Sequence, residues 1–189
     1  MIRSNARRFE IHYTHLETQI GRLLVAYDDS NLTGLYFENH AGGPPPAVVA
    51  RALPMKDLVR SARTPLLQAL DRQLDEYFQG KRTSFDIALH TDGTSFQELV
   101  WKALMDIPYG EVITYSQLAG RIGKASAVRA VGTASSRNPI SILIPCHRVV
   151  GAGGRLTGYA GGLERKRQLL EIERPTKLPR ISSTHPRPM

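Results

Sequence analysis

Cysteine is almost absent from this chain of 189 residues, whose one thiol belongs to Cys146. A single thiol excludes an intrachain disulfide and any metal site built from several cysteines. The six histidines are scattered, and none falls in the two-histidine spacing of a helical zinc site, so we expect no metal and no cofactor. An unpaired thiol is typical of the reducing interior of a cell, so the predicted location is the cytoplasm.

Long apolar runs are also missing. The run "ISILIP", residues 140–145, is far shorter than the roughly 20 residues that cross a bilayer as a helix, so we expect no membrane association. The opening "MIRSNARRFEIHY" has basic residues without a following apolar stretch and predicts no secretory signal. Negative charge is scarce as well: the net charge is +8. This surplus favours a polyanionic partner, because neutralising phosphates releases their counterions.

The first half of the chain predicts a small α+β domain over residues 1–91. Apolar and polar residues alternate in three bursts across residues 9–37, which is typical of an antiparallel β-meander. The prolines and glycines of residues 40–49 predict a loop. A helix should begin near Thr64, with Pro65 at its first position, and end by Gly80. Residues 84–90, "SFDIALH", predict a further strand.

The second half, residues 92–175, predicts a mainly helical domain. Ser95 and Glu98 have capping-box spacing ahead of a helix that should end by Pro108. A last helix is expected over residues 163–173. Residues 176–189 are rich in proline and serine without an apolar period, so we expect a disordered tail.

Two short helices in the middle of this half predict a helix-turn-helix. Thr114 and Gln117 repeat the capping-box spacing and open the first helix, which Gly123 ends. Ser126 is expected to cap the second helix, "AVRAVGTASS". Two short helices joined by a glycine turn are typical of this DNA-binding unit.

The single thiol is flanked by residues that change its chemistry. "ISILIP" has the pattern of a buried strand, and Pro145 would end the pairing, which places Cys146 at the end of a strand. His147 and Arg148 follow at once, and nearby positive charge favours the nucleophilic thiolate. The alternative is an inert cysteine that acts as a small apolar core residue.

The imidazole beside the thiol needs a bend or a water molecule to reach it, because neighbouring side chains of an extended chain point to opposite faces. Glu171 and Glu173 are the candidates to orient His147; a solvent-facing histidine without a role is the alternative. The segment "GAGGRLTGYAGG", residues 151–162, places six glycines around Tyr159. Bare backbone and an aromatic face suit a flat ligand, although a flexible surface loop would have the same composition.

Residues 138–151, "NPISILIPCHRVVG", and residues 156–170, "LTGYAGGLERKRQLL", resemble the O6-alkylguanine-DNA alkyltransferases, also called methylated-DNA–protein-cysteine methyltransferases. The similarity extends from about Phe96 to Glu173. It implies an RNase H-like first domain with an antiparallel sheet and a second domain with a helix-turn-helix. The implied activity is DNA repair: irreversible, single-turnover transfer of an alkyl group from O6-alkylguanine, and from O4-alkylthymine, to the protein's own cysteine.

The resemblance also implies roles in the reaction. Cys146 would accept the alkyl group, His147 would act as a base through a water molecule, and Glu173 would hold His147. Asn138 would brace the turn that carries the thiol, and Tyr115 would donate a proton toward the leaving guanine. A donor there is chemically sensible, because displacement leaves negative charge on the base.

DNA contacts are implied as well. A base must leave the stack to expose its O6 alkyl group, and Arg129 would fill the vacated place in the duplex. Small residues on the second short helix, Ala127, Ala130 and Ser135, would let it enter the minor groove, and Arg137 would contact a phosphate. The flipped base would lie against Val149, Tyr159 and Ala160.

The expected partner is therefore double-stranded DNA, with the protein associated with the nucleoid when bound, and the expected state is a monomer, with cooperative assembly on DNA left open. The chain lacks the cysteines of the zinc-bound module that some members of the family carry. Two other functions remain open: a cysteine hydrolase that uses Cys146, His147 and Glu173, and a DNA-binding module with a structural thiol.

Overall fold

A computed structural model of the chain describes residues 11–38 and 64–174. The expected loop at 40–49 and the expected tail at 176–189 lie outside these residues. The first half forms a three-stranded antiparallel sheet in the order β1-β2-β3, with β1 at His12–Leu16, β2 at Leu23–Tyr27 and β3 at Leu32–Phe37. The predicted β-meander is confirmed.

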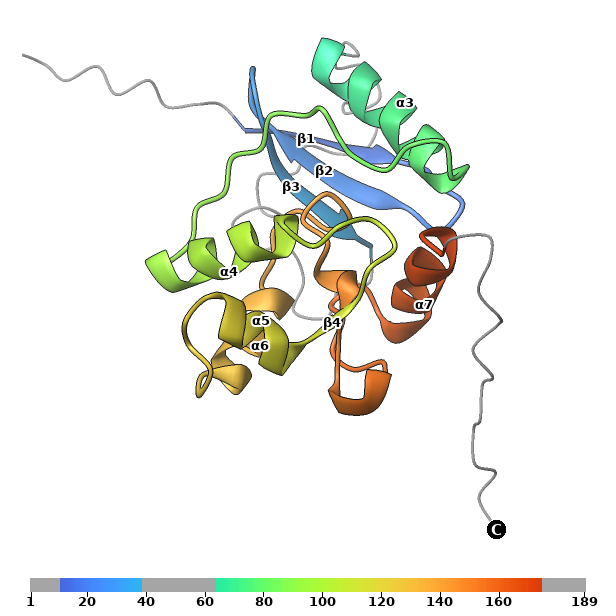
Figure 1. Cartoon of the computed structure of the whole chain (residues 1–189). Helices are drawn as coiled ribbons and strands as arrows, with labels where there is room; N and C mark the ends of the chain where they lie inside the picture. Colours follow the sequence, from blue (N-terminus) through green and yellow to red (C-terminus); the bar gives the residue numbers. More distant parts are fainter. Residues whose placement is uncertain (1–10, 39–63, 175–189) are drawn as a thin grey trace, which may run out of the picture.

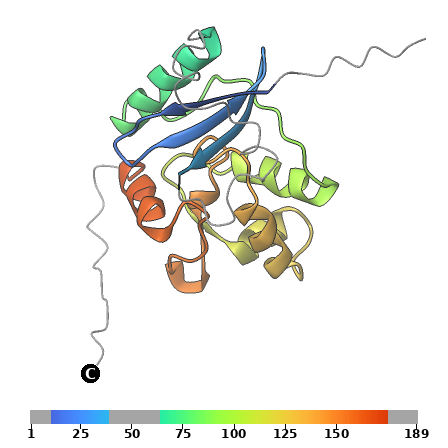
Figure 2. The ribbon, with the colours of Figure 1, turned by 180° about the vertical axis from the view of Figure 1, so that it is seen from behind.

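Helix α3, Pro65–Phe78, begins where the sequence predicts. The Thr64 side chain accepts a hydrogen bond from the backbone N–H of Leu67, and Pro65 occupies the first turn. Both views of the ribbon show α3 along the sheet, with its C-terminal end next to α7 (Figures 1 and 2).

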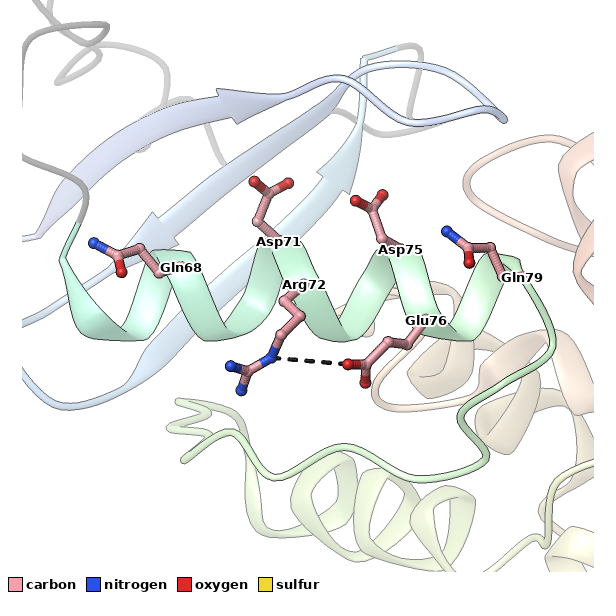
Figure 3. A pocket seen from close by; sticks show the side chains of 6 residues that line it. All are labelled: Gln68, Asp71, Arg72, Asp75, Glu76 and Gln79. Carbon is pink, nitrogen blue, oxygen red and sulfur yellow. Dashed lines mark ion pairs between the residues drawn. The ribbon is translucent and has the colours of Figure 1, made fainter.

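The outer face of α3 is polar and mainly acidic (Figure 3). It borders a shallow depression of about 700 Å³. Arg72 pairs with Glu76 there, with 3.8 Å between Nε and Oε1. The residues that line the depression are Gln68, Asp71, Arg72, Asp75, Glu76 and Gln79. Arg82 also pairs with Glu76, with 2.7 Å between Nε and Oε2, so three carboxylates meet two guanidinium groups and the face is weakly negative.

The second half is mainly helical and lies next to β3 (Figure 1). Its helices and strands are α4 (Ser95–Met105), β4 (Ile113–Thr114), α5 (Tyr115–Arg121), α6 (Val128–Ser136), β5 (Val149–Val150) and α7 (Leu163–Ile172). β4 and β5 pair in parallel, and 3-10 turns occupy Cys146–Arg148 and Ala152–Gly154. In the described part of the chain, no helix is long and apolar enough to cross a membrane.

The capping box of α4 lies one residue earlier than predicted. Thr94, not Ser95, accepts the hydrogen bond from the backbone of Gln97, and the Gln97 side chain accepts from the backbone of Thr94. Glu98 instead accepts a hydrogen bond from the hydroxyl of Thr91 at 2.6 Å. Threonine–glutamine and serine–glutamate share the same spacing, so the sequence offers two registers and tertiary contacts select one.

The capping box of α5, formed by Thr114 and Gln117, is confirmed. The cap predicted for α6 is wrong: Ala127 occupies the N-cap position, and no side chain caps this helix end. α5 and α6 pack together and are joined by a turn in which Gly123 has a φ of +68°, so they form the expected helix-turn-helix.

Two predicted strands are absent. Residues 84–90 make only an isolated bridge, between Leu89 and Leu32. The run 140–145 forms turns, in which Ile142 has a left-handed φ of 73°. The cause is Asn138, whose carboxamide accepts from the backbone of Ile140 and donates to the carbonyl of Ile144. The run still meets β3 once, in an isolated bridge between Ile140 and Leu35, and beyond that bridge the bonds of Asn138 hold it as a turn.

One continuous apolar core joins the two halves. Its buried members include Phe37 from the sheet, Leu70 and Tyr77 from α3, Trp101 from α4 and Leu169 from α7. The Trp101 indole also donates a hydrogen bond to the carbonyl of Ala134 in α6, which fixes the helix-turn-helix on this core. The segment that carries the thiol is therefore held from both sides.

Candidate active site

Cys146 begins the 3-10 turn that follows Pro145, and 7% of its surface is exposed. The Asn138 amide donates to Cys146 Sγ at 3.2 Å and to the carbonyl of Ile144 at 2.8 Å. Burial raises the pKa of the Cys146 thiol, while the bond from Asn138 and the charge of Lys166 oppose that rise. The thiol therefore keeps its proton at neutral pH and needs a base to become a nucleophile.

The His147 imidazole is fully buried and faces a carboxylate on one side only. Its Nε2 lies 2.8 Å from Glu173 Oε1, whereas Nδ1 has no hydrogen-bond partner among the described residues. Burial lowers the pKa of His147, although Glu173 opposes this effect. A neutral imidazole that donates from Nε2 to the carboxylate leaves the lone pair of Nδ1 free to accept a proton.

Glu173, directly after α7, is the carboxylate that holds His147. Arg148 binds it through two nitrogens, Nε to Oε2 at 2.8 Å and Nη2 to Oε1 at 2.9 Å, and the Tyr77 hydroxyl donates to Oε1 at 2.7 Å. Burial alone would raise the pKa of Glu173, but the hydrogen bonds from His147 and Arg148 and the charge of Arg148 outweigh it and bring the pKa to about 2. The carboxylate is therefore charged throughout the neutral range.

The glycine-rich loop and α5 bring two tyrosines near the thiol. Tyr115, the first residue of α5, donates its hydroxyl to the carbonyl of Gly158 at 3.1 Å. Burial raises the pKa of Tyr115 to about 12, and the pKa of Tyr159 rises well above 10; the charge of Cys146 adds to both shifts. Tyr159 and Ala160 are each 8% exposed, and the Tyr159 ring packs edge-on against Phe37.

The exposed side chains along α6 are short, apart from that of Arg129. Arg129, Ala130 and Thr133 are exposed along it. Arg137, exposed at the C-terminal end of α6, borders with Ala130 a depression of about 330 Å³. α6 lies at the end of the molecule away from α3 (Figures 1 and 2). The arrangement exposes a narrow helix edge with positive charge, which is what a nucleic-acid groove accepts.

Two family models match the chain. The model described as "6-O-methylguanine DNA methyltransferase, ribonuclease-like domain" matches residues 11–91, and "6-O-methylguanine DNA methyltransferase, DNA binding domain" matches residues 95–175. The chain belongs to the 6-O-methylguanine DNA methyltransferase family. The predicted fold class, with an antiparallel sheet and helices in the first half and a helix-turn-helix in the second, is confirmed.

Curated and solved members of this methyltransferase family cover nearly the whole chain. A methylated-DNA–protein-cysteine methyltransferase of Methanosarcina barkeri is 46% identical over 86% of this chain and 97% of its own length. The corresponding protein of Mycobacterium tuberculosis is 45% identical over 87% and 93%. A crystal structure of the M. tuberculosis O6-methylguanine methyltransferase superposes with a TM-score of 0.76 at 41% identity, over 90% of this chain and 96% of that one.

A further crystal structure contains the M. tuberculosis protein in complex with DNA. It matches with a TM-score of 0.75 at 42% identity and covers 87% of this chain and 96% of that one.

Within this methyltransferase, the structure brings together most of the residues that the sequence analysis selected. Between the two candidate carboxylates it chooses Glu173, because Glu171 lies at the surface and pairs with Arg167 at 2.6 Å. Ser135 differs from the expectation: it is buried, and its hydroxyl donates to the carbonyl of Val131. A hydroxyl that faces the preceding helical turn is not available to DNA, so Ser135 leaves the set of candidate contacts.

Lys166 is a residue of the site that the sequence analysis missed. It is fully buried, and its Nζ donates to the carbonyls of Val149 at 2.5 Å and Thr157 at 2.7 Å. Burial lowers the pKa of Lys166 to about 8. The signal was available, since Lys166, Leu169 and Glu173 are three and four residues apart and therefore lie on one side of α7 and its C-cap. The bond also means that the carbonyl of Val149, a residue expected to lie against the base, already has a partner.

Proposed function

We propose that this protein repairs DNA by moving the alkyl group of O6-alkylguanine, and of O4-alkylthymine, onto Sγ of Cys146. One observation carries the assignment of residues: beside a protonated, buried thiol stands a neutral imidazole whose Nε2 is held by Glu173 and whose Nδ1 is free. That combination supplies a base for a thiol that burial keeps uncharged.

The chemical step balances with the groups present. His147 Nδ1 takes the thiol proton, through a water molecule where the two do not touch, and Glu173 stabilises the resulting imidazolium. Sγ then forms a bond to the alkyl carbon as the bond from that carbon to O6 breaks. The electron pair of the broken bond stays on guanine, which takes up a proton, so the net exchange is one alkyl group for one hydrogen.

Tyr115 is the donor proposed for the leaving base. Burial keeps its phenol protonated, and its hydroxyl already points at a carbonyl, that of Gly158. When a base enters, the same hydroxyl turns from the Gly158 carbonyl to the purine and offsets the charge that develops there. The product on Cys146 is a thioether, which neither ionises nor leaves, so each molecule reacts once.

The duplex is proposed to lie against α6 with its minor groove. The exposed, short side chains around Ala130 allow a close approach, and Ala127 is the N-cap of the same helix. Arg137, exposed at the other end of α6, is the proposed phosphate contact. Arg129 replaces the extruded base in the stack and offsets part of the flipping cost, which is a few kcal/mol. α3, which carries Asp71, Asp75 and Glu76, lies at the other end of the molecule from α6, so its carboxylates do not oppose this approach (Figures 1 and 3).

The same proposal includes a monomer that acts in the cytoplasm and associates with the nucleoid while bound to DNA. The described part of the chain contains no cluster of three side chains of the kind that holds a metal ion. Every step above uses only protein side chains and a water molecule, so the proposed reaction requires none.

The deciding experiment maps the product. The protein is incubated with a duplex that contains one O6-methylguanine, and its peptides are analysed by mass spectrometry, with Cys146→Ser as the matched control. We expect a mass increase of one methyl group on Cys146 and consumption of one substrate per protein. Repeated turnover would support a hydrolase or another catalytic enzyme instead, and the absence of any adduct on folded protein would leave only a DNA-binding module.

A further inference from the structure

A tyrosine from the first half of the chain reaches the carboxylate that serves the base. Tyr77, near the end of α3, donates its hydroxyl to Glu173 Oε1 at 2.7 Å across 96 positions of sequence. His147 Nε2 uses that same oxygen at 2.8 Å. The other side chain and backbone donors to this carboxylate, Arg148 and Gly110, belong to the second half. Among the described residues, Tyr77 is thus the contribution of the first half to the His147–Glu173 pair.

The surroundings of Tyr77 hold its hydroxyl in one place. The ring is fully buried and meets Tyr109 edge-on, at 6.0 Å between centroids and 90° between planes. Phe78 and Phe85 pack against it at 5.5 Å and 5.4 Å. Burial, together with the charge of Glu173, raises the pKa of Tyr77 well above 10. The phenol therefore remains a proton donor at every pH at which the protein works.

The hydrogen bond from Tyr77 changes how strongly Glu173 Oε1 attracts His147. A hydrogen bond from a neutral donor to a carboxylate is charge-assisted and draws electron density toward the donor. Glu173 Oε1 then attracts the His147 imidazolium less strongly than an oxygen without that bond would. Since an imidazolium is stabilised by the charge it faces, Tyr77 favours the neutral imidazole that accepts a proton.

We propose that Tyr77 is a positioning residue of the reaction, which orients Glu173 and moderates its hold on His147 from the opposite half of the molecule. This inference rests on the proposed function, because that function assigns His147 as the base. It gives the first half a task beyond packing, although that half contributes no atom to the bond that forms.

The test compares single-turnover alkylation rates across pH. In the wild-type protein the rate should fall on the acid side as the His147–Cys146 pair takes up a proton, with an apparent pKa that belongs to the pair. In Tyr77→Phe, Glu173 holds the imidazolium more tightly. The acid limb of the pH–rate profile should therefore move to higher pH, by about half a unit to one unit for the loss of one hydrogen bond to the charged form of Glu173.

Two further variants separate this shift of the pH–rate profile from a loss of stability. Tyr109→Phe removes a hydroxyl that donates to the Ile172 carbonyl at 2.9 Å, next to Glu173 in sequence, and should leave the limb unmoved. Replacement of Tyr77 by 3-fluorotyrosine keeps the ring and makes the hydroxyl a stronger donor, so the limb should move to lower pH. This replacement also keeps the test decisive if Tyr77→Phe fails to fold.

The outcomes distinguish the inference from the function beneath it. Opposite shifts for phenylalanine and fluorotyrosine, with unchanged affinity for DNA, support the proposal. An unmoved limb in both variants, or an equal shift in Tyr109→Phe, overturns it while leaving alkyl transfer intact. A wild-type protein that gains no methyl group on Cys146 overturns the proposed function itself.

Discussion

Replacing Glu173 by glutamine is the sharpest perturbation of the site, because it removes one charge with almost no change in volume. The side chain is 1% exposed, and donors approach both of its oxygens. Oε1 accepts from Tyr77, His147 and Arg148, and Oε2 accepts from Arg148 and Gly110. Either orientation of a glutamine amide therefore turns its NH2 group toward other donors.

The loss of stability follows from the Arg148 guanidinium, which is left without its carboxylate. Removing one partner of a buried ion pair costs about 3–5 kcal/mol, since the remaining charge is uncompensated. For a chain of this size, about 2–4 °C of Tm is lost per kcal/mol, so the fall in Tm should be roughly 6–20 °C. The alkylation rate should fall about 10²- to 10⁴-fold, because His147 loses the anion that stabilises its protonated form. Affinity for DNA, measured in a Cys146→Ser background, should stay near that of the wild type.

Two further variants separate reactivity from stability. Glu171→Gln breaks a surface pair with Arg167, in which both side chains are about half exposed, and should cost at most about 1 kcal/mol without slowing transfer. Combining Arg148→Met with Glu173→Gln removes both buried charges and should recover much of the Tm. The rate should stay low. If the double variant regained the rate together with the Tm, Glu173 would be a structural residue and our reasoning about the base would be refuted.

The remaining predictions concern base extrusion by Arg129, the charge of Lys166 and the loss of stability at low pH. Arg129→Ala should slow transfer by about tenfold or more on duplex DNA and much less on a single strand, where no base has to leave a stack; equal losses on both substrates would contradict the intercalating role. Lys166→Met should raise the pH at which iodoacetamide labels Cys146, because the thiolate loses a nearby cation, and an unchanged labelling profile would dismiss that effect. Since the folded pKa of Glu173 is about 2 against 4.5 for an unperturbed glutamate, its stabilisation is complete above pH 4.5 and fades toward pH 2. The difference in unfolding free energy between wild type and Glu173→Gln, measured by urea titration, should therefore narrow across that interval.

Local signals in the sequence predicted the helices well. Thr64 with Pro65 and Thr114 with Gln117 satisfy backbone groups within one helical turn, so nothing distant has to be known. The predicted strand at residues 140–145 was wrong, because apolar periodicity reports burial and not the partner of the backbone. Its apolar residues are buried as in a strand, but it pairs with β3 only in an isolated bridge at Ile140, and the carboxamide of Asn138 turns the rest of the run, which sequence periodicity does not reveal.

The active site was predictable to the extent that its members are neighbours in sequence. Cys146 and His147 stand together, whereas the choice between Glu171 and Glu173 depended on how α7 ends against the core. Lys166 has a readable spacing from Glu173, but the backbone carbonyls of Val149 and Thr157, which stabilise it in the interior, have no signature in a sequence.

The placement of Glu173 explains why the two halves of the chain share one core. A carboxylate with a pKa near 2 and an imidazole that stays neutral beside it both depend on exclusion of water. α3 and Tyr77 close the side of the carboxylate that α7 and the Cys146 turn leave open. If the first half only stabilised the second, its contacts could be apolar throughout. A polar contact to the oxygen that holds the base instead makes the reactivity of the thiol depend on a segment about 70 residues earlier in the chain.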